Sequence, residues 1–174
     1  MRVIGLDLGT QCGYAFTETD KVVGAQTGAW DLKPKRFEGG GFRYLRFGEM
    51  VLELIGRNVG KPGSRKSSDV VVFFEEVGYH RGADAAHVYG AFYGKLQEVC
   101  DSLSVPYRGI PIGTIKKRAT NSGRANKADM IRAAKREWDV AMTDDQADAA
   151  WVLQCGLDTI ANTVKPITEE DYWI

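Results

Sequence analysis

The sequence predicts an α/β domain with a mixed five-stranded sheet and helices on both faces. Residues 2–31 read as three short strands with short connections, which favours antiparallel pairing. Beyond them, helical and strand-like segments alternate along the chain, as in sheets that are covered on both faces. At 174 residues the chain can bury roughly two thirds of its unfolded surface around one core. We therefore predict a single domain over residues 1–168, followed by a C-terminal tail at residues 169–174.

The expected strands are short and differ in character. The first three cover residues 3–8, 13–17 and 22–30. Residues 70–74 form a continuous β-branched and aromatic run, which suits a strand covered on both faces. Residues 105–110 supply the fifth strand.

The expected helices are identified by periodicity or by capping residues. The first covers residues 41–55, and the second covers residues 83–100, where small residues allow another backbone to approach. Asn126 is typical of an N-cap for a helix that ends near Trp138, and Thr143 of an N-cap for a last helix that ends near Ile160. The segment from Thr114 to Asn126 is interpreted as a loop.

The composition excludes several classes of protein. Apolar residues make up 44% and charged residues 26% of the chain, which is ordinary for a globular domain. The apolar runs are too short to span a bilayer, and the first residues lack the pattern of a signal peptide, so we expect a protein that stays inside the cell. Cys12, Cys100 and Cys155 form no paired CxxC motif and are expected to be reduced packing residues.

Carboxylates stand at the ends of two predicted strands. Asp7 lies inside the first strand, and Glu75 ends the most hydrophobic one, where a charge is unfavourable unless that edge opens to solvent, a metal or a partner. Because side chains alternate along a strand, Glu75 and Glu76 cannot both face one site. An alternative is that Glu75 and Glu76 are ordinary solvated residues.

Three more carboxylates open the last helix. Asp145 and Asp148 share a face, and so do Asp144 and Asp148, so the spacing alone does not choose between the pairs. The helix macrodipole alone can also favour acidic residues in a first turn. If these acids meet Asp7 and Glu75 at one sheet edge, their oxygen atoms suit Mg²⁺ or Mn²⁺, two of which can activate water and stabilise a leaving oxygen. The chemistry that this predicts is phosphodiester hydrolysis.

Basic residues concentrate in two segments. Residues 108–136 hold nine basic residues and the single acid Asp129. The groups in this segment that we expect to contact DNA phosphates, unless it is simply a solvated loop, are Thr114, Lys116, Lys117, Arg118, Arg124 and Lys127. The second segment interleaves Lys33, Lys35, Arg36, Arg43 and Arg46 with Phe37, Phe42, Tyr44 and Phe47. These aromatic rings could stack on bases, although we expect most of them in the core.

Three motifs resemble those of the RuvC-type Holliday-junction resolvases, which have an RNase H-like fold. They are Gly-Leu-Asp-Leu-Gly-Thr at residues 5–10 with Gly13-Tyr14, Phe-Glu-Glu-Val at 74–77, and Asp-Gln-Ala-Asp-Ala-Ala at 145–150. The resemblance implies that Asp7, Glu75, Asp145 and Asp148 are the catalytic residues and ligate Mg²⁺, for which Mn²⁺ can substitute. It also implies a similar basic surface at Lys116 and Lys127.

The same resemblance implies a function and a partner. The function is metal-dependent endonucleolytic nicking of Holliday junctions and other branched DNA, by a homodimer in which the helix after Glu75 is a plausible interface. Leu8 stands where many members have Pro, and Gly78 and Tyr79 stand where they have a Phe, which puts the preferred cut sequence in doubt. The compact length is similar to that of phage-encoded members, so we expect the cytoplasm of a bacterium or of a phage-infected host.

Other functions remain open at this point. Residues 5–10 also resemble the first phosphate-binding turn of actin-like ATPases and sugar kinases, although those proteins need a second domain. A junction-binding module without catalysis could use the same basic surface. An RNase H acting on hybrids, or a YqgF-like RNA-processing enzyme, would have similar acids. His80 and His87 lack a partner spaced for zinc or for a catalytic triad, and neither is expected to ligate a metal.

Overall fold

The computed structural model describes residues 1–56, 59–79 and 82–163, so the predicted tail at 169–174 and His80 lie outside the described residues. The strands are β1 (Arg2–Asp7), β2 (Gln11–Thr17), β3 (Gln26–Asp31), β4 (Val70–Glu76) and β5 (Tyr107–Pro111). The helices are α1 (Phe42–Ile55), α2 (Ala83–Ser102), α3 (Ile112–Thr120), α4 (Lys127–Trp138) and α5 (Asp144–Thr163), with a short 3₁₀ helix at Ser67–Asp69. None of the helices in these ranges is long and apolar enough to cross a membrane.

The strands form one mixed sheet in the order β3-β2-β1-β4-β5. The antiparallel pairs are β1 with β2 and β2 with β3, as the short connections predict. The parallel pairs are β1 with β4 and β4 with β5, and each is connected through a helix. The predicted mixed five-stranded sheet is therefore confirmed.

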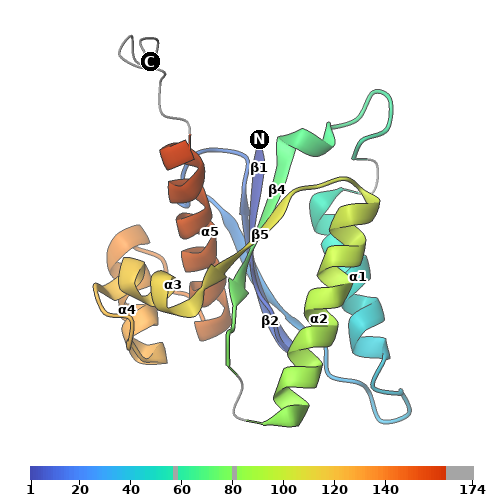
Figure 1. Ribbon diagram of the computed structural model, residues 1–174. Helices are drawn as coiled ribbons and strands as arrows, with labels where there is room; N and C mark the ends of the chain where they lie inside the picture. Colours follow the sequence, from blue (N-terminus) through green and yellow to red (C-terminus); the bar gives the residue numbers. More distant parts are fainter. Residues whose placement is uncertain (57–58, 80–81, 164–174) are drawn as a thin grey trace, which may run out of the picture.

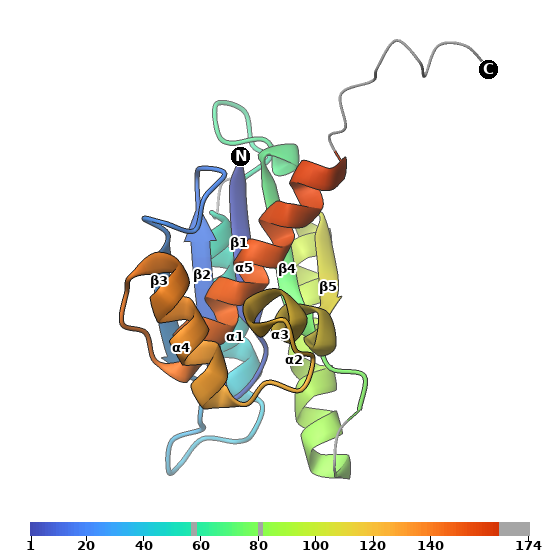
Figure 2. The same cartoon turned by 90° about the vertical axis from the view of Figure 1, so that its left-hand side faces the viewer.

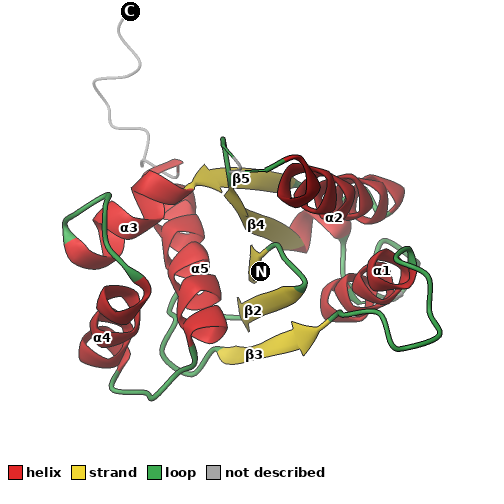
Figure 3. Cartoon of the chain, turned by 90° about the horizontal axis from the view of Figure 1, so that it is seen from below, coloured by secondary structure: helices red, strands yellow, loops and turns green. Residues whose placement is uncertain are grey.

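Helices cover both faces of this sheet (Figures 1 and 2). Seen from below, the sheet lies between α1 and α2 on one side and α5 on the other (Figure 3). Helices α3 and α4 lie next to α5, further from the sheet. The helices that follow β3 and β4 thus lie on one face, and the last helix closes the opposite face.

Side-chain alternation divides the apolar core into two clusters. On β1, Val3 packs toward α5, whereas Ile4 and Leu6 pack toward α1 and α2. On β4, Phe73 packs toward α5 and Phe74 toward α1 and α2. A strand repeats every two residues, so the α5 side continues with Gly5 and Asp7 after Val3, and with Glu75 after Phe73.

Two predictions of secondary structure are wrong. The segment expected as a loop after Thr114 contains helix α3, which forms because Ile115 and Ala119, four residues apart, are buried against the cluster that includes α5. Strand β3 begins at Gln26 rather than at residue 22, because the chain first makes a turn in which Gly24 adopts a φ of 82°.

The predicted caps and cysteines agree with the structure. Asn126 and Asp129 form a reciprocal capping box at the start of α4. At the start of α5, the backbone N–H of Gln146 donates to Thr143 Oγ1 at 3.3 Å, and Gln146 Oε1 accepts from the backbone N–H of Thr143 at 2.9 Å. All three cysteines are free and buried.

Candidate active site

The last residues of β1 and β4 place Asp7 and Glu75 next to each other. In the register of the two parallel strands Leu6 lies opposite Phe74, so Asp7 and Glu75 follow directly on the same face. Glu76, one residue further on, is exposed and points to the other face. The alternation of β4 therefore selects Glu75 over Glu76.

The backbone around Glu75 is held by a side chain from α2. The Tyr89 hydroxyl donates to the carbonyl oxygen of Glu75 at 3.0 Å and accepts from the backbone N–H of Val77 at 3.2 Å. The hydroxyl thus bridges the point where β4 leaves the sheet. Tyr89 positions Glu75 without taking part in the acidic cluster.

Helix α5 reaches the same sheet edge because two strand residues lack side chains. A Cβ on Gly5 would lie 2.6 Å from the backbone nitrogen of Leu153, and a Cβ on Gly13 would overlap the backbone carbonyl of Asp145. The helix is therefore in direct backbone contact with β1 and β2. This close approach brings Asp145 and Asp148, in the first turns of α5, next to Asp7.

Three of the four predicted acids line one hollow of about 250 Å³. It is bordered by Asp7, Glu75 and Asp148, by Lys116 and Lys127, and by Ile112 and Met130. Asp145 does not border the hollow, but its charge acts on Asp7. A second, wider hollow on the α2 side of Asp7 and Glu75 measures about 450 Å³ and is bordered by residues 8–10, Val77 and Tyr89, among others.

The carboxylates repel one another and are partly shielded from water. Burial raises the pKa of Asp7 well above its usual value, and the charges of Glu75, Asp148 and Asp145 raise it further. Burial, with the charge of Asp148, raises the pKa of Glu75 to about 7. Burial raises the pKa of Asp148 to about 6, although Lys127 acts in the opposite direction. This accumulation of negative charge is unfavourable in the absence of a cation.

Lysines from α3 and α4 face the acids. Lys116 lies in α3 and Lys127 is the first residue of α4, and both border the hollow. Lys127 Nζ forms an ion pair with Asp144 Oδ2 at 2.5 Å, which raises the pKa of the lysine and lowers that of Asp144. Asp144 thus anchors Lys127 beside the hollow, whereas Asp145 and Asp148 act on Asp7.

The other predicted DNA contacts lie away from the acids. The Arg118 guanidinium pairs with Asp158 at 2.7 Å and lies over the ring of Trp151, so it is engaged with α5. Arg124 borders a separate hollow together with Arg132 and Arg136. Thr114 and Lys117 are exposed on α3. Their contact with DNA stays a prediction.

The acidic donors suit a divalent ion, although their side chains stand apart from one another. Asp7, Glu75, Asp145 and Asp148 offer only carboxylate oxygens, the ligand type that Mg²⁺ and Mn²⁺ prefer. Within the described ranges, no three Asp, Glu, His or Cys side chains are arranged closely enough to hold an ion. A cation would relieve the mutual repulsion between these acids, so the chemistry of the residues, rather than their spacing in this structure, fits such an ion. His87 lies exposed on α2 and borders neither hollow of the acidic cluster.

The strand order and the helices on both faces define an RNase H-like α/β fold. Two solved structures of RuvC from Thermus thermophilus share it. One, described as a complex with Holliday junction substrate, is 21% identical over 96% of this chain and 99% of that chain, with a TM-score of 0.71. The other is 20% identical over 96% of this chain and 100% of that chain, with a TM-score of 0.68. No family model and no curated protein matches the sequence.

Proposed function

We propose that the protein is a divalent-metal-dependent endonuclease that resolves Holliday junctions and cuts related branched DNA. The observation that carries the proposal is the hollow in which three carboxylates from β1, β4 and α5 face two lysines from α3 and α4. Such a site can hold cations on one side and a phosphodiester on the other. The RuvC structure whose fold resembles this chain was solved with a Holliday junction, which supports branched DNA as the substrate.

Asp7, Glu75, Asp145 and Asp148 would hold Mg²⁺ or Mn²⁺. Ions held by these residues would supply activation of a water molecule and neutralisation of the charge on the phosphate during hydrolysis. The carboxylates must be ionised to act as ligands, so ion binding displaces the protons that their raised pKa values retain.

Lys116 and Lys127 would orient the DNA backbone. Both lysines border the hollow that contains the acids, so a phosphate bound to them would lie near the carboxylates. The ion pair with Asp144 fixes Lys127 at this position. Ile112 and Met130 add apolar walls, which limit the access of water to the reacting phosphate.

The working form would be a homodimer that places two such sites on one four-way junction. Helix α2 presents an exposed row of small residues, Ala86, Gly90 and Gly94, which is compatible with close packing against a second copy. Sedimentation of the purified protein with and without a junction tests this state. A monomer on a resolved junction would contradict it.

The decisive experiment is cleavage of a labelled four-way junction, a Y-fork and a linear duplex with Mg²⁺, with Mn²⁺ and with EDTA. We expect paired symmetrical nicks in the junction that require the metal, and weaker nicking of the fork. Asp7→Asn should abolish cutting while preserving junction binding, whereas the exposed Asp101→Asn on α2 serves as a matched control. Metal-independent binding without cuts would indicate a junction-binding module instead, and unchanged cutting by Asp7→Asn would refute the assigned site.

A further inference from the structure

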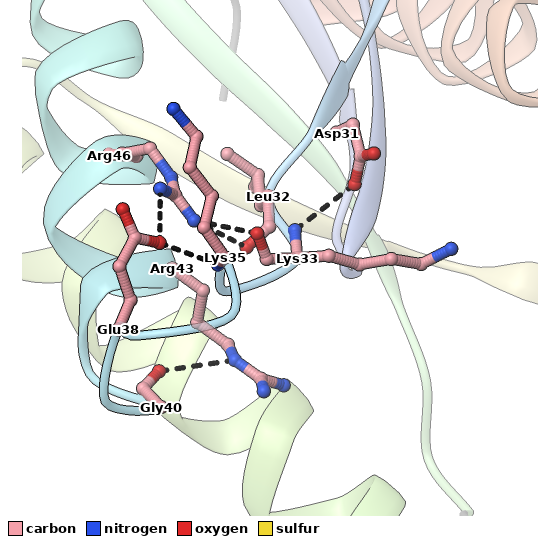
Figure 4. A network of polar contacts seen from close by, with 8 residues as sticks. All are labelled: Asp31, Leu32, Lys33, Lys35, Glu38, Gly40, Arg43 and Arg46. Atoms are coloured by element: carbon pink, nitrogen blue, oxygen red, sulfur yellow. Dashed lines mark hydrogen bonds and ion pairs between the residues drawn. The ribbon is translucent and has the colours of Figure 1, made fainter.

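The connection between β3 and α1, residues 32–41, is an ordered loop held by Arg46 (Figure 4). Arg46 Nη1 donates to Glu38 Oε2 at 2.7 Å, and Arg46 Nη2 donates to the carbonyl oxygen of Lys33 at 2.8 Å. Glu38 Oε2 also accepts from the backbone N–H of Lys35 at 2.7 Å. One guanidinium from α1 therefore fixes both halves of the loop.

This loop begins at the sheet edge that carries the acids. The backbone N–H of Leu32 donates to the carbonyl oxygen of Thr10 at 2.9 Å. Thr10 borders the wider hollow together with Asp7 and Glu75. In Figure 1 the loop lies at the lower end of the molecule, next to the start of α1. The first residue of the loop is therefore hydrogen-bonded to a residue that borders the wider hollow.

The ordered loop presents an aromatic ring to solvent. Phe37 is 93% exposed, and the Arg36 guanidinium lies 5.5 Å from the centroid of its ring. Phe47, from the same basic and aromatic segment, is buried as expected, whereas Phe42 is 47% exposed. The expectation that most of these rings lie in the core is thus met by Phe47 but not by Phe37 or Phe42. The ring of Phe37 is therefore free to contact a binding partner on a loop whose backbone is held by Arg46.

The outward charge of this surface is positive. Lys33, Lys35 and Arg36 are exposed in the loop, and Lys33 and Lys35 extend away from the network in Figure 4. The two carboxylates nearby are engaged locally, because Glu38 pairs with Arg46 and Asp31 Oδ1 accepts from the backbone N–H of Lys33 at 3.1 Å. Cations around an exposed ring are complementary to a nucleic acid, whose phosphates are negative and whose bases have flat faces.

We propose that the loop at residues 32–41 binds DNA at the branch point, where Phe37 stacks on an unstacked base and Lys33, Lys35 and Arg36 contact the flanking phosphates. This inference rests on the proposed function and specifies the form of the substrate. A base is free to stack on Phe37 only where the duplex is interrupted, so the loop selects branched DNA over continuous duplex. The stack is independent of base identity, because every base has a flat face.

The test compares Phe37→Ala with Phe37→Trp in the full chain that also carries Asp7→Asn, so that bound DNA stays intact. Fluorescence anisotropy measures the Kd for a labelled four-way junction and for a linear duplex of equal length. We expect Phe37→Ala to weaken junction binding about 5- to 100-fold, the range for loss of one base stack, with little change for the duplex. Phe37→Trp should retain the affinity. Val23→Ala is the matched control, since Val23 is 66% exposed in the turn before β3, at the other end of that strand from the loop.

The outcomes separate this inference from the proposed function. If the Asp7→Asn parent fails to bind junctions, the proposed function fails before any loop variant is compared. If that parent binds junctions and Phe37→Ala binds them equally well, only the loop inference is overturned. Sedimentation of the same variants distinguishes a protein interface, because a dimer that dissociates on Phe37→Ala would assign the ring to a second copy and would also overturn the inference.

Discussion

Gly13 lies against the backbone of Asp145, and a Cβ added to Gly13 would come within 2.7 Å of the Asp145 carbonyl carbon. The same glycine is the partner of Asp7 in the β1–β2 ladder. One residue without a side chain therefore sets how close the first turn of α5 comes to the acid at the end of β1. The separation of the carboxylates depends on backbone contact as well as on their own side chains.

Gly13→Ala should displace the start of α5 and damage the site. The added methyl meets backbone rather than a flexible side chain, so relief requires the helix to move. We expect cleavage to fall at least about tenfold and the free energy of unfolding to fall by about 1–3 kcal/mol, as for other overpacked positions. Cleavage assays and denaturant unfolding measure the two effects. Gly78→Ala, where an added Cβ meets no atom within 4 Å, is the control, and equal behaviour of the two variants would contradict this account of α5.

Tyr89→Phe should reduce activity by loosening the backbone at Glu75. It removes the hydroxyl that joins Glu75 and Val77 but leaves the ring in place. We expect a several-fold lower kcat with junction affinity unchanged, and a loss of about 1 kcal/mol in unfolding free energy. Single-turnover cleavage at several enzyme concentrations separates the cleavage rate from the junction affinity. Tyr107→Phe, whose hydroxyl makes only a 3.5 Å contact to Asp101, should leave the rate unaltered, and a weaker affinity with a normal rate would assign Tyr89 to DNA binding instead.

Lys116→Ala and Lys127→Ala should each weaken binding to all branched DNA tested. Each lysine borders the acidic hollow, and the loss of one phosphate contact makes the negative slope of log K against log salt shallower by about 0.9 for duplex DNA. Binding titrations at several salt concentrations give the slope. Lys135→Ala, an exposed lysine at the end of α4, should leave it nearly unchanged. If the slopes of all three variants equal that of the parent, the DNA surface lies elsewhere.

Stability without metal should decrease as pH rises. The folded protein keeps protons on Glu75 and Asp148, with pKa values of about 7 and about 6, after the unfolded chain has lost them. Between pH 4.5 and 7 the folded state therefore binds more protons, and linkage makes unfolding easier as pH increases. We expect Tm in EDTA to fall from pH 5 to pH 8, by roughly 2–4 °C for each kcal/mol of stability lost in a chain of this size. Saturating Mg²⁺ should reverse most of the loss at pH 8.

Asp7→Asn should flatten that pH dependence. The substitution removes the carboxyl of Asp7, whose pKa is raised well above its usual value by burial and by the charges of Glu75, Asp148 and Asp145, so the folded state retains one proton fewer. At pH 8 in EDTA the variant should be slightly more stable than the parent. Differential scanning calorimetry at matched pH values checks both points. A variant with the parent's slope would mean that Asp7 retains no proton in the folded state over this pH range.

Most helices and strands could be predicted from the sequence because the residue patterns that define them are local. The run at residues 70–74 and the capping pairs at Asn126 and Thr143 each act within a few residues. Helix α3 was missed because it has only two buried residues, Ile115 and Ala119, and its stability comes from packing against elements distant in sequence. Strand alternation excluded a joint role for Glu75 and Glu76, and the observed register shows which of them faces α5.

The contacts that hold the site residues in place could not be predicted from the sequence in the same way. Asp144 pairs with Lys127 across 17 residues, and Tyr89 reaches Glu75 across 14. No periodic pattern links such positions, since they meet only after the helices dock on the sheet. The spacing of Asp144, Asp145 and Asp148 therefore left two possible pairs, and the ion pair with Lys127 gives Asp144 a different role.

The acids enter the chain in the order Asp7, Glu75, and then the first turns of α5, which is the last element of the described domain. Synthesis proceeds from the N-terminus, so the two strand carboxylates emerge well before Asp145 and Asp148. The backbone contact at Gly13 also forms only when α5 docks. A growing chain would therefore carry only two of these four acids for most of its synthesis, and the acidic cluster would be complete only after α5 docks on the sheet.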